Sequence, residues 1–295
     1  MRIPSIPGLL FIAFLSKSEA AEFTLAADKN HIQSPAVTEA SGLAISQENE
    51  HFLWTLNDSG NTSELHLLNT DGADRGKVTV TNATNIDWED IASFTLDGKP
   101  YLLIADTGDN NATRKSCTVY ILREPQLPAD GQKLSGTASV EWHIDFTYQG
   151  GARDCEAVAA DTVSEKIILI SKRTKPPEVY ELPMRAPQKK GALVLTKIGQ
   201  TSVESPAGNL LPFANQPTGL DISADRSVAA VVTYHGVFLF PRKPAESWTE
   251  AFAHKPTPLG PHRLAQAESV AFSKDGKNIY VTSEGKNPLV LRYGR

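Results

Sequence analysis

The chain has 295 residues, of which 40% are hydrophobic and 21% charged, with 20 Gly and 19 Pro. This ordinary globular composition excludes a collagen-like or largely disordered chain, and the length suits one large β architecture. The net charge of −5 excludes general nucleic-acid binding, which requires a basic face.

The N-terminal segment predicts a secretory signal peptide over residues 1–20. A basic residue precedes the apolar run "IPGLLFIAFL", and Ser18 and Ala20 occupy the small-residue positions before a cleavage site. Two charged residues near that site are unusual, so a membrane anchor is the alternative, although the run is too short to span a bilayer. We expect the remaining chain to be secreted or periplasmic, with no membrane contact after cleavage.

Beyond this segment, short β-rich runs alternate with Gly, Asp, Asn and Pro turns, and helical periodicity is nearly absent. Five of these runs are related and recur at intervals of 48 to 67 residues. They are "EASGLAIS" (39–46), "DWEDIASF" (87–94), "DCEAVAAD" (154–161), "QPTGLDIS" (216–223) and "QAESVAFS" (266–273). Aligned on their third residue, they match at Ser41, Glu89, Glu156, Thr218 and Glu268.

Each related run is followed by further strand-like runs. Second strands are predicted in "HFLWTLND", "YLLIADTG", "KIILISKR", "VAAVVTYH" and "NIYVTSEG". Third strands follow these, and fourth strands are predicted in "KVTVTNA", "ASVEWHIDF" and "ALVLTKI". A unit of four antiparallel strands repeated radially is typical of a β-propeller.

We therefore predict an all-β fold, a single β-propeller over residues 21–295. Five blades are preferred and six are the alternative, with the sixth in the longest interval or in "TSVESPAGNLLPFANQ". The last unit ends at its third strand, so a strand from the N-terminal stretch "AEFTLAADKNHI" is predicted to close the ring.

In this topology the connections into the first strands and the loops between second and third strands lie at the same end of the ring. Polar side chains from both should converge on one mouth of the central channel, the default place for a ligand. The acidic and amide candidates are Glu89, Glu156 and Glu268 from first strands and Asn57, Asp58, Asp106, Asp109 and Glu284 from the loops. The basic candidates are Arg153, Lys172, Arg173 and His235.

Three interpretations of this mouth stay open. Its oxygens suit a divalent cation, Ca²⁺ or Mg²⁺/Mn²⁺. Two of its carboxylates suit metal-free acid/base chemistry, as in glycoside hydrolysis. Alternatively, the acids pair with Arg153, Lys172 and Arg173 and only hold the blades together.

Cys117 and Cys155 are the only cysteines. Export permits a disulfide between them, but we favour two separate, buried thiols. Glycosylation sequons occur at Asn57, Asn61, Asn82 and Asn111, and they matter only in a host that glycosylates secreted proteins.

At "WTLNDSGN", "NIDWEDIA", "YLLIADTGDNNATR", "VYILREP" and "DCEAVAAD" the chain resembles a group of exported bacterial β-propeller proteins. The resemblance covers residues 39–161 well and 162–295 more weakly. This group is distantly similar to gluconolactonase and regucalcin-type proteins and to esterase-like phytases. The resemblance implies a divalent metal bound in the channel, with Glu89, Glu156, Asn57 and Asp106 in the ligand roles, although fold similarity alone does not carry function.

Together these patterns predict a monomeric, metal-dependent hydrolase of a small ester, lactone or phosphoester. Asp58 or Asp106 would act as general base or further ligand, and Lys172 or Arg173 would stabilise negative charge in the transition state. Arg153, Asp109, His235, Glu268 and Glu284 would contact the small-molecule or glycan ligand. The alternative is a non-catalytic scaffold that binds a glycan, peptide or protein on the loop face.

Overall fold

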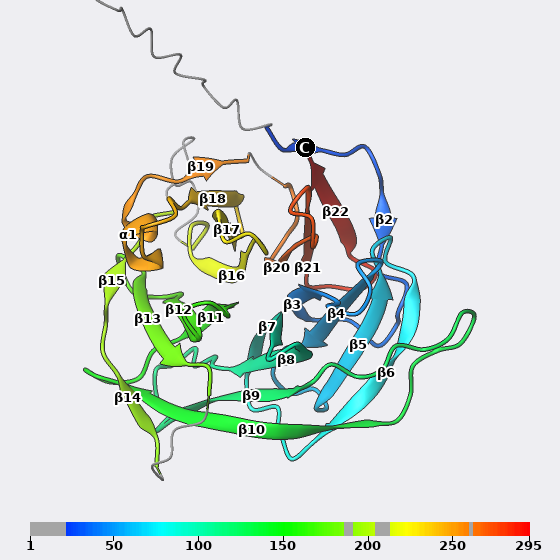
Figure 1. Cartoon of the computed structure of the whole chain (residues 1–295), viewed down its shortest axis with the longest axis horizontal. Helices are drawn as coiled ribbons and strands as arrows, with labels where there is room; N and C mark the ends of the chain where they lie inside the picture. Colours follow the sequence, from blue (N-terminus) through cyan, green and yellow to red (C-terminus); the bar gives the residue numbers. More distant parts are fainter. Residues whose placement is uncertain (1–21, 186–190, 204–212, 260–261) are drawn as a thin grey trace, which may run out of the picture.

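The computed structural model describes residues 22–185, 191–203, 213–259 and 262–295. Within these ranges the chain forms 22 β-strands and one six-residue helix. This is an all-β fold, consistent with a propeller (Figure 1). The predicted signal peptide and most of the stretch considered for a sixth blade lie outside the described residues.

The first strand of each repeat lies next to the central axis (Figure 1). Each of these inner strands contacts the next one along the chain, and the last contacts the first, so they form a closed cycle. They are β3 (Ala40–Ile45), β7 (Trp88–Leu96), β11 (Cys155–Asp161), β16 (Pro217–Ile222) and β20 (Ala267–Phe272).

Each inner strand pairs antiparallel with a second strand, and that strand pairs antiparallel with a third. The second strands are β4 (Phe52–Asn57), β8 (Lys99–Asp106), β12 (Lys166–Ser171), β17 (Val228–Thr233) and β21 (Asn278–Ser283). The third strands are β5 (Glu64–Asn69), β9 (Cys117–Arg123), β13 (Glu178–Pro183), β18 (Val237–Pro241) and β22 (Leu289–Gly294).

The outer strands are less regular than the sequence suggests. They are β6 (Asp74–Thr81), β10 (Thr137–Tyr148), β14 (Leu193–Leu195), β15 (Gly199–Gln200) and β19 (Thr257–Pro258). The run "ALVLTKI" was expected to pair with the third strand of its own unit, but β14 pairs parallel with β10 of the preceding unit, and β13 takes β15 instead. Strand β10 is long enough for β6 and β14 to cover the two ends of its outer edge, which would otherwise expose unpaired backbone groups.

The helix α1 (Trp248–Ala253) lies between β18 and β19. Its N-terminus has a capping box in which Ser247 and Glu250 satisfy each other's backbone N–H groups. Trp248, Ala251 and Phe252 are buried, so the helix covers the apolar outer part of this region of the ring. This helix of the described ranges is too short to span a membrane.

The predicted closure by the N-terminal stretch is confirmed. Strands β1 (Thr24–Leu25) and β2 (Asn30–His31) both pair antiparallel with β22 near the C-terminus (Figure 1). Phe23 packs edge-on against Phe272 of the inner strand in the same unit. The first two described strands and the last one are thereby joined, which protects the exposed edge of β22.

The cysteines are both buried and free, as the sequence analysis favoured. Cys117 and Cys155 belong to one apolar cluster between neighbouring sheets. Burial raises the pKa of the Cys117 thiol to about 12, and a thiol that stays protonated is a poor nucleophile and a poor metal ligand. Both cysteines therefore act as packing residues.

Candidate functional site

The five inner strands carry a β-bulge at the same position. In each pairing with the second strand, the register skips the second residue of the inner strand. The skipped residues are Ser41, Glu89, Glu156, Thr218 and Glu268, the residues on which the sequence repeats align. A bulged residue leaves the ladder and redirects its side chain, so the chain presents five equivalent side chains around one axis.

A second set of side chains lies beside the bulges. The residue before each bulge pairs with the last residue of the second strand, so the residue that follows the second strand comes next to the bulged one. These neighbours are Asp58, Thr107, Lys172, Tyr234 and Glu284. The mouth is therefore built from matching positions of all five units.

Lys172 is the buried cation of the mouth. It forms an ion pair with Glu156, and its Nζ lies 3.8 Å from Glu268. Its ammonium donates to the Tyr234 hydroxyl at 3.1 Å, and that hydroxyl donates to Glu268 at 2.7 Å. Burial alone would lower the pKa of Lys172, but the charges of Glu156 and Glu268 outweigh burial and raise it. Lys172 thus stays charged and links three units.

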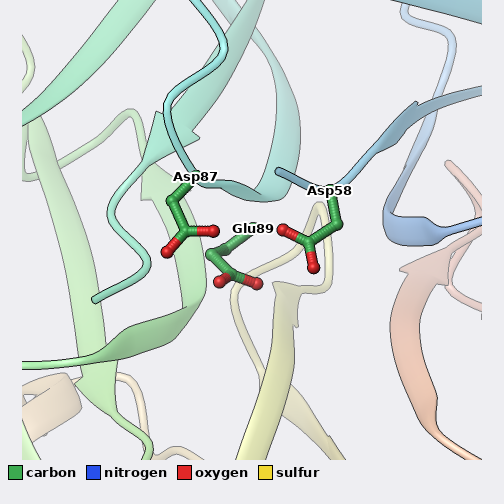
Figure 2. A group of neighbouring side chains, drawn as sticks. All are labelled: Asp58, Asp87 and Glu89. Carbon is green, nitrogen blue, oxygen red and sulfur yellow. The ribbon is translucent and has the colours of Figure 1, made fainter. Parts of the chain in front are cut away.

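Glu89 belongs to two groups of carboxylates at once. It forms one group with Asp58 and Asp87, between which it lies (Figure 2), and a second group with Asp154 and Glu156. Within each group, one oxygen from every residue lies within 4.8 Å of the others. Ser41 donates a hydrogen bond to Glu89 at 3.2 Å. Among the ion pairs of the described residues, none involves Asp58, Asp87 or Glu89.

This crowding raises the pKa values of the acids. Burial and the charge of Glu156 hold the pKa of Glu89 well above its usual range. Burial raises the pKa of Glu156 to about 8, although Lys172 opposes the shift. Burial and the charge of Asp58 raise the pKa of Asp87 to about 6. Such shifts mean that the positive charge nearby, including Lys172 beside Glu156, does not fully compensate the buried carboxylates, and protons or a cation would supply the rest.

Asn57 and Asp106 lie outside the two groups. Each is the last residue of a second strand, and successive residues of a strand point to opposite faces. The Asn57 side chain donates to the carbonyl of Ala36 and accepts from two backbone N–H groups of the same loop. Asp106 accepts from the backbone N–H of Asp87 and pairs with Arg114 at 2.8 Å. Both therefore shape the loops that carry the cluster.

Three further predicted residues have partners at the rim. Arg173 pairs with Asp154 at 2.6 Å, which places it next to the cluster. Asp109 accepts from two backbone N–H groups of its own loop. Arg153 pairs with Glu178 at 2.8 Å rather than with an acid of the mouth.

Glu284 interacts with a carboxylate of the mouth, whereas the hydrogen bond of His235 is within its own turn. Glu284 accepts from Gln266 at 2.7 Å and interacts with Glu268, whose pKa is held well above its usual range by burial and the charge of Glu156. His235 lies in the turn after β17, where its backbone N–H donates to Thr233.

The sequence analysis did not include Asp87, Asp154 or Tyr234 among the site residues. Asp87 and Asp154 each stand two positions before a bulged Glu, in "DWED" and "DCEA". This shared D-x-E spacing is the signal that could have identified them. Tyr234 stands at the position of Lys172 in the next unit, an equivalence that the aligned runs "KIILISKR" and "VAAVVTYH" already contain and that the strand register bears out.

Deeper in the channel, Asp90 ties three inner strands together. It is fully buried, and its Oδ2 accepts the backbone N–H of Val158 at 2.8 Å and of Leu220 at 3.2 Å. Its Oδ1 accepts the N–H of Ile91 at 2.9 Å. Asp221 joins the next pair of inner strands, β16 and β20, in the same way, because its side chain accepts the backbone N–H of Phe272 at 2.7 Å. The inner strand edges thus find acceptors in side chains rather than in another strand.

The carboxylate groups could hold a cation, and we expect Gly108→Ala to weaken the binding of any cation there. A Cβ at this position would overlap Glu89 Oε1 and lie 2.6 Å from Asp87 Oδ2, so both carboxylates would have to move. A loss of about tenfold in affinity, measured by calorimetry with Mn²⁺, is expected from such a displacement. Gly294→Ala is the matched control, because its Cβ would meet only Asn278 Oδ1 at 3.4 Å. Equal affinities in the two variants would contradict this role of Gly108.

Comparisons with known proteins bear on the fold. No protein-family model and no curated protein matches the chain. The structure is similar to that of the major allergen Mala s 1 of Malassezia sympodialis, with a TM-score of 0.54 and 11% identity, over 90% of this chain and 96% of that one. A gluconolactonase from Xanthomonas campestris (TM-score 0.46, 11% identity, 92% of this chain and 97% of that one) is a weaker match. A chain of a nidogen/laminin complex (TM-score 0.45, 15% identity, 84% and 73%) is equally weak. At such identities similarity concerns the fold alone, and any function has to follow from the chemistry of the mouth.

Proposed function

We propose that this chain is a secreted or periplasmic five-bladed β-propeller whose mouth binds a divalent cation and hydrolyses a small ester, lactone or phosphoester. The five equivalent bulges around one axis support the count of five blades. The monomeric state and export are part of the same proposal.

The observation that carries the cation is the set of three carboxylates without a basic partner. Asp58, Asp87 and Glu89 converge (Figure 2), and none of the ion pairs among the described residues involves them. Carboxylate oxygens are hard donors that suit Ca²⁺, Mg²⁺ or Mn²⁺. With Asp154 and Glu156 they would hold the cation, and Asn57 and Asp106 would position the surrounding loops.

A bound divalent cation would polarise the scissile oxygen and lower the pKa of a water molecule. The chain's own residues would do the rest. Lys172, held by Glu156 and Tyr234, would stabilise negative charge that develops on the substrate. Asp58 is only partly buried and its pKa is raised by burial, so it would be able to accept a proton from a water molecule at the rim.

Turnover of generic nitrophenyl esters and phosphates, with and without chelator, tests this proposal. We expect turnover that a chelator abolishes and that Mn²⁺, Mg²⁺ or Ca²⁺ restores. Turnover that is insensitive to the chelator would contradict the role of the cation. No turnover on any substrate, with a glycan or peptide still bound at the loop face, would favour the non-catalytic scaffold, in which the pairs Lys172–Glu156 and Arg173–Asp154 only join the blades.

The raised pKa values predict how stability depends on pH without a cation. The folded pKa values of Asp87 (about 6) and Glu156 (about 8) lie above their usual values, so folding favours the protonated acids. The protonated acids contribute fully to the free energy of unfolding at pH values below their unfolded pKa values near 4. This contribution is lost as the pH rises through their folded pKa values, from 6 to 8. In chelator, the melting temperature should fall by roughly 5 °C over this range.

The same melts with Ca²⁺ or Mn²⁺ provide the comparison. A cation favours the deprotonated acids, so its stabilising effect should grow with pH over the same window. A melting temperature in chelator that stays constant or rises between these pH values would contradict the assignment of buried, cation-free acids.

A further inference from the structure

A cavity lies at the end of the ring opposite the carboxylate mouth, and we call it the far cavity. The bulged residues stand at the start of the inner strands, whereas this cavity is lined where the same five strands end. It has a volume of about 230 Å³. A concave site shaped by five strands is a candidate for a small ligand. Its lining includes Ile45 of β3, Ser93 of β7, Ala160 of β11, Asp221 of β16 and Phe272 of β20.

Three charged side chains line the far cavity: Asp221, Arg226 and Lys274. Arg226 is neutralised by Asp161, to which it donates at 2.7 Å. Among the ion pairs of the described residues, none involves Asp221 or Lys274. The far cavity therefore presents one carboxylate and one ammonium group, each without a charged partner in the described part of the chain.

Both groups keep unused hydrogen-bonding capacity. The Asp221 oxygens accept the backbone N–H groups of Ile222 at 2.8 Å and Phe272 at 2.7 Å, and a carboxylate offers about four acceptor positions. The Lys274 ammonium donates to the carbonyl of Gln47 at 2.7 Å, and an ammonium group can donate further hydrogen bonds. One ligand can therefore donate to Asp221 and accept from Lys274 at the same time.

The position of Asp221 in the repeat is unusual. Alignment of the five inner strands places Ala44, Ala92, Ala159 and Ala271 at the equivalent position, so the fold forms with a small apolar residue there. A buried carboxylate destabilises the folded chain unless it is compensated. Burial raises the pKa of Asp221 to about 7 despite its two backbone hydrogen bonds, so the compensation is incomplete. A cationic group of a ligand would supply the rest.

We propose that the far cavity binds a small zwitterion of the free amino acid class, with its ammonium group at Asp221 and its carboxylate at Lys274. The apolar lining residues Ile45, Phe94 and Phe272 would contact the aliphatic part of such a ligand. This site goes beyond the proposed function and is independent of it, because the far cavity shares no residue with the carboxylate groups of the mouth.

Ligand-observed NMR with four probes tests the proposal at a pH of about 8, where Asp221 is mainly ionised. The probes are L-alanine and γ-aminobutyrate, which are zwitterions of different length, and propionate and propylamine, which carry one charge each. We expect saturable binding of at least one zwitterion. Both singly charged probes should bind about tenfold more weakly or less, because each makes only one of the two charged contacts.

Variants of the two charged residues test their roles. Lys274→Met and Asp221→Asn should each weaken zwitterion binding by about tenfold. Asp221→Ala, which copies the residue of the other four units, replaces Asp221→Asn if that variant does not fold. Lys277→Met is the matched control and should bind as the parent does. Lys277 lies in the same turn as Lys274, pairs with Asp275 and does not line the cavity.

The proposal is overturned if neither zwitterion binds, or if propionate or propylamine binds as tightly as the better zwitterion. It is also overturned if folded variants at both Asp221 and Lys274 bind as the parent does. Calorimetry with Mn²⁺ on the same samples separates this site from the mouth, and the cation affinity of these variants should equal that of the parent. Zwitterion binding without cation binding would overturn only the proposed function, and the reverse would overturn only the far cavity.

Discussion

Glu89→Gln should abolish cation binding and, in the absence of a cation, make the protein more stable. Glu89 is the one residue shared by both carboxylate groups, so its loss removes a ligand from each. Substitution of residues that merely orient ligands costs 10- to 100-fold in affinity, and a shared ligand should cost more than about 100-fold. Burial and the neighbouring acids raise the pKa of Glu89, so at neutral pH folding without a cation has to protonate this acid. The amide keeps the shape and is neutral at every pH, which removes this cost.

Calorimetry with Mn²⁺ and thermal melts in chelator provide both readouts. Glu141→Gln is the control, because Glu141 lies at the exposed outer edge and pairs with Arg123. It should leave cation affinity unchanged. If instead the acids only join the blades, Glu89→Gln would lower stability in chelator and affect no ligand. That combination of results would remove Glu89 from the proposed site.

Asp90→Ala should cause the largest loss of stability of any single substitution considered. Asp90 is fully buried and accepts backbone N–H groups from β7, β11 and β16. Truncation would leave these buried donors without an acceptor, at about 1–3 kcal/mol for each. The free energy of unfolding should therefore fall by about 3 kcal/mol or more in denaturant titrations.

Two variants control for the loss of the acidic group itself. Asp130→Ala, at an exposed turn, should change stability little. Asp90→Asn keeps an oxygen acceptor and should fall between the parent and Asp90→Ala. A loss in Asp90→Ala no larger than in Asp130→Ala would show that the inner strands are held together by other contacts.

The register of the inner strands was predictable from the sequence. The alignment on Ser41, Glu89, Glu156, Thr218 and Glu268 depends on local patterns of apolar and turn residues, and the structure has a bulge at each of these positions. The closing strand was predictable as well, because a last unit with three strands leaves an edge that needs a partner. For the inner strands and the closing strand, the local sequence pattern therefore agrees with the long-range strand pairing.

The composition of the carboxylate cluster was less predictable. Asn57 and Asp58 are adjacent in sequence, yet Asp58 belongs to the carboxylate cluster, whereas the Asn57 side chain bonds to the backbone of Ala36, Thr38 and Glu39. Alternate residues of a strand point to opposite sides. Which side a residue takes depends on where the strand ends and where the bulge falls. Loop sequence alone does not fix either, so the place of Asp87 and Asp154 in the two groups did not follow from the sequence.

The pairing of the outer strands was not predictable from local patterns. The short run that forms β14 has the same apolar character whichever neighbour it joins. Its pairing with β10 depends on the length of β10 and on the course of chain between units. The choice of partner for such a short strand depends on the packing of the whole ring, because the possible pairings differ by only a few backbone hydrogen bonds.

The most direct test is a crystal structure of the protein soaked with Mn²⁺, with anomalous diffraction data. The bulges of the inner strands gather carboxylates around one axis, so we expect an ion to bind there, with Glu89 among its ligands. The space is bounded by Asp58, Asp87, Glu89, Asp154 and Glu156. An anomalous peak at that position is the expected result. An empty mouth, with Glu89 protonated or bonded only to protein groups, would contradict the claim that these acids are gathered to hold a cation.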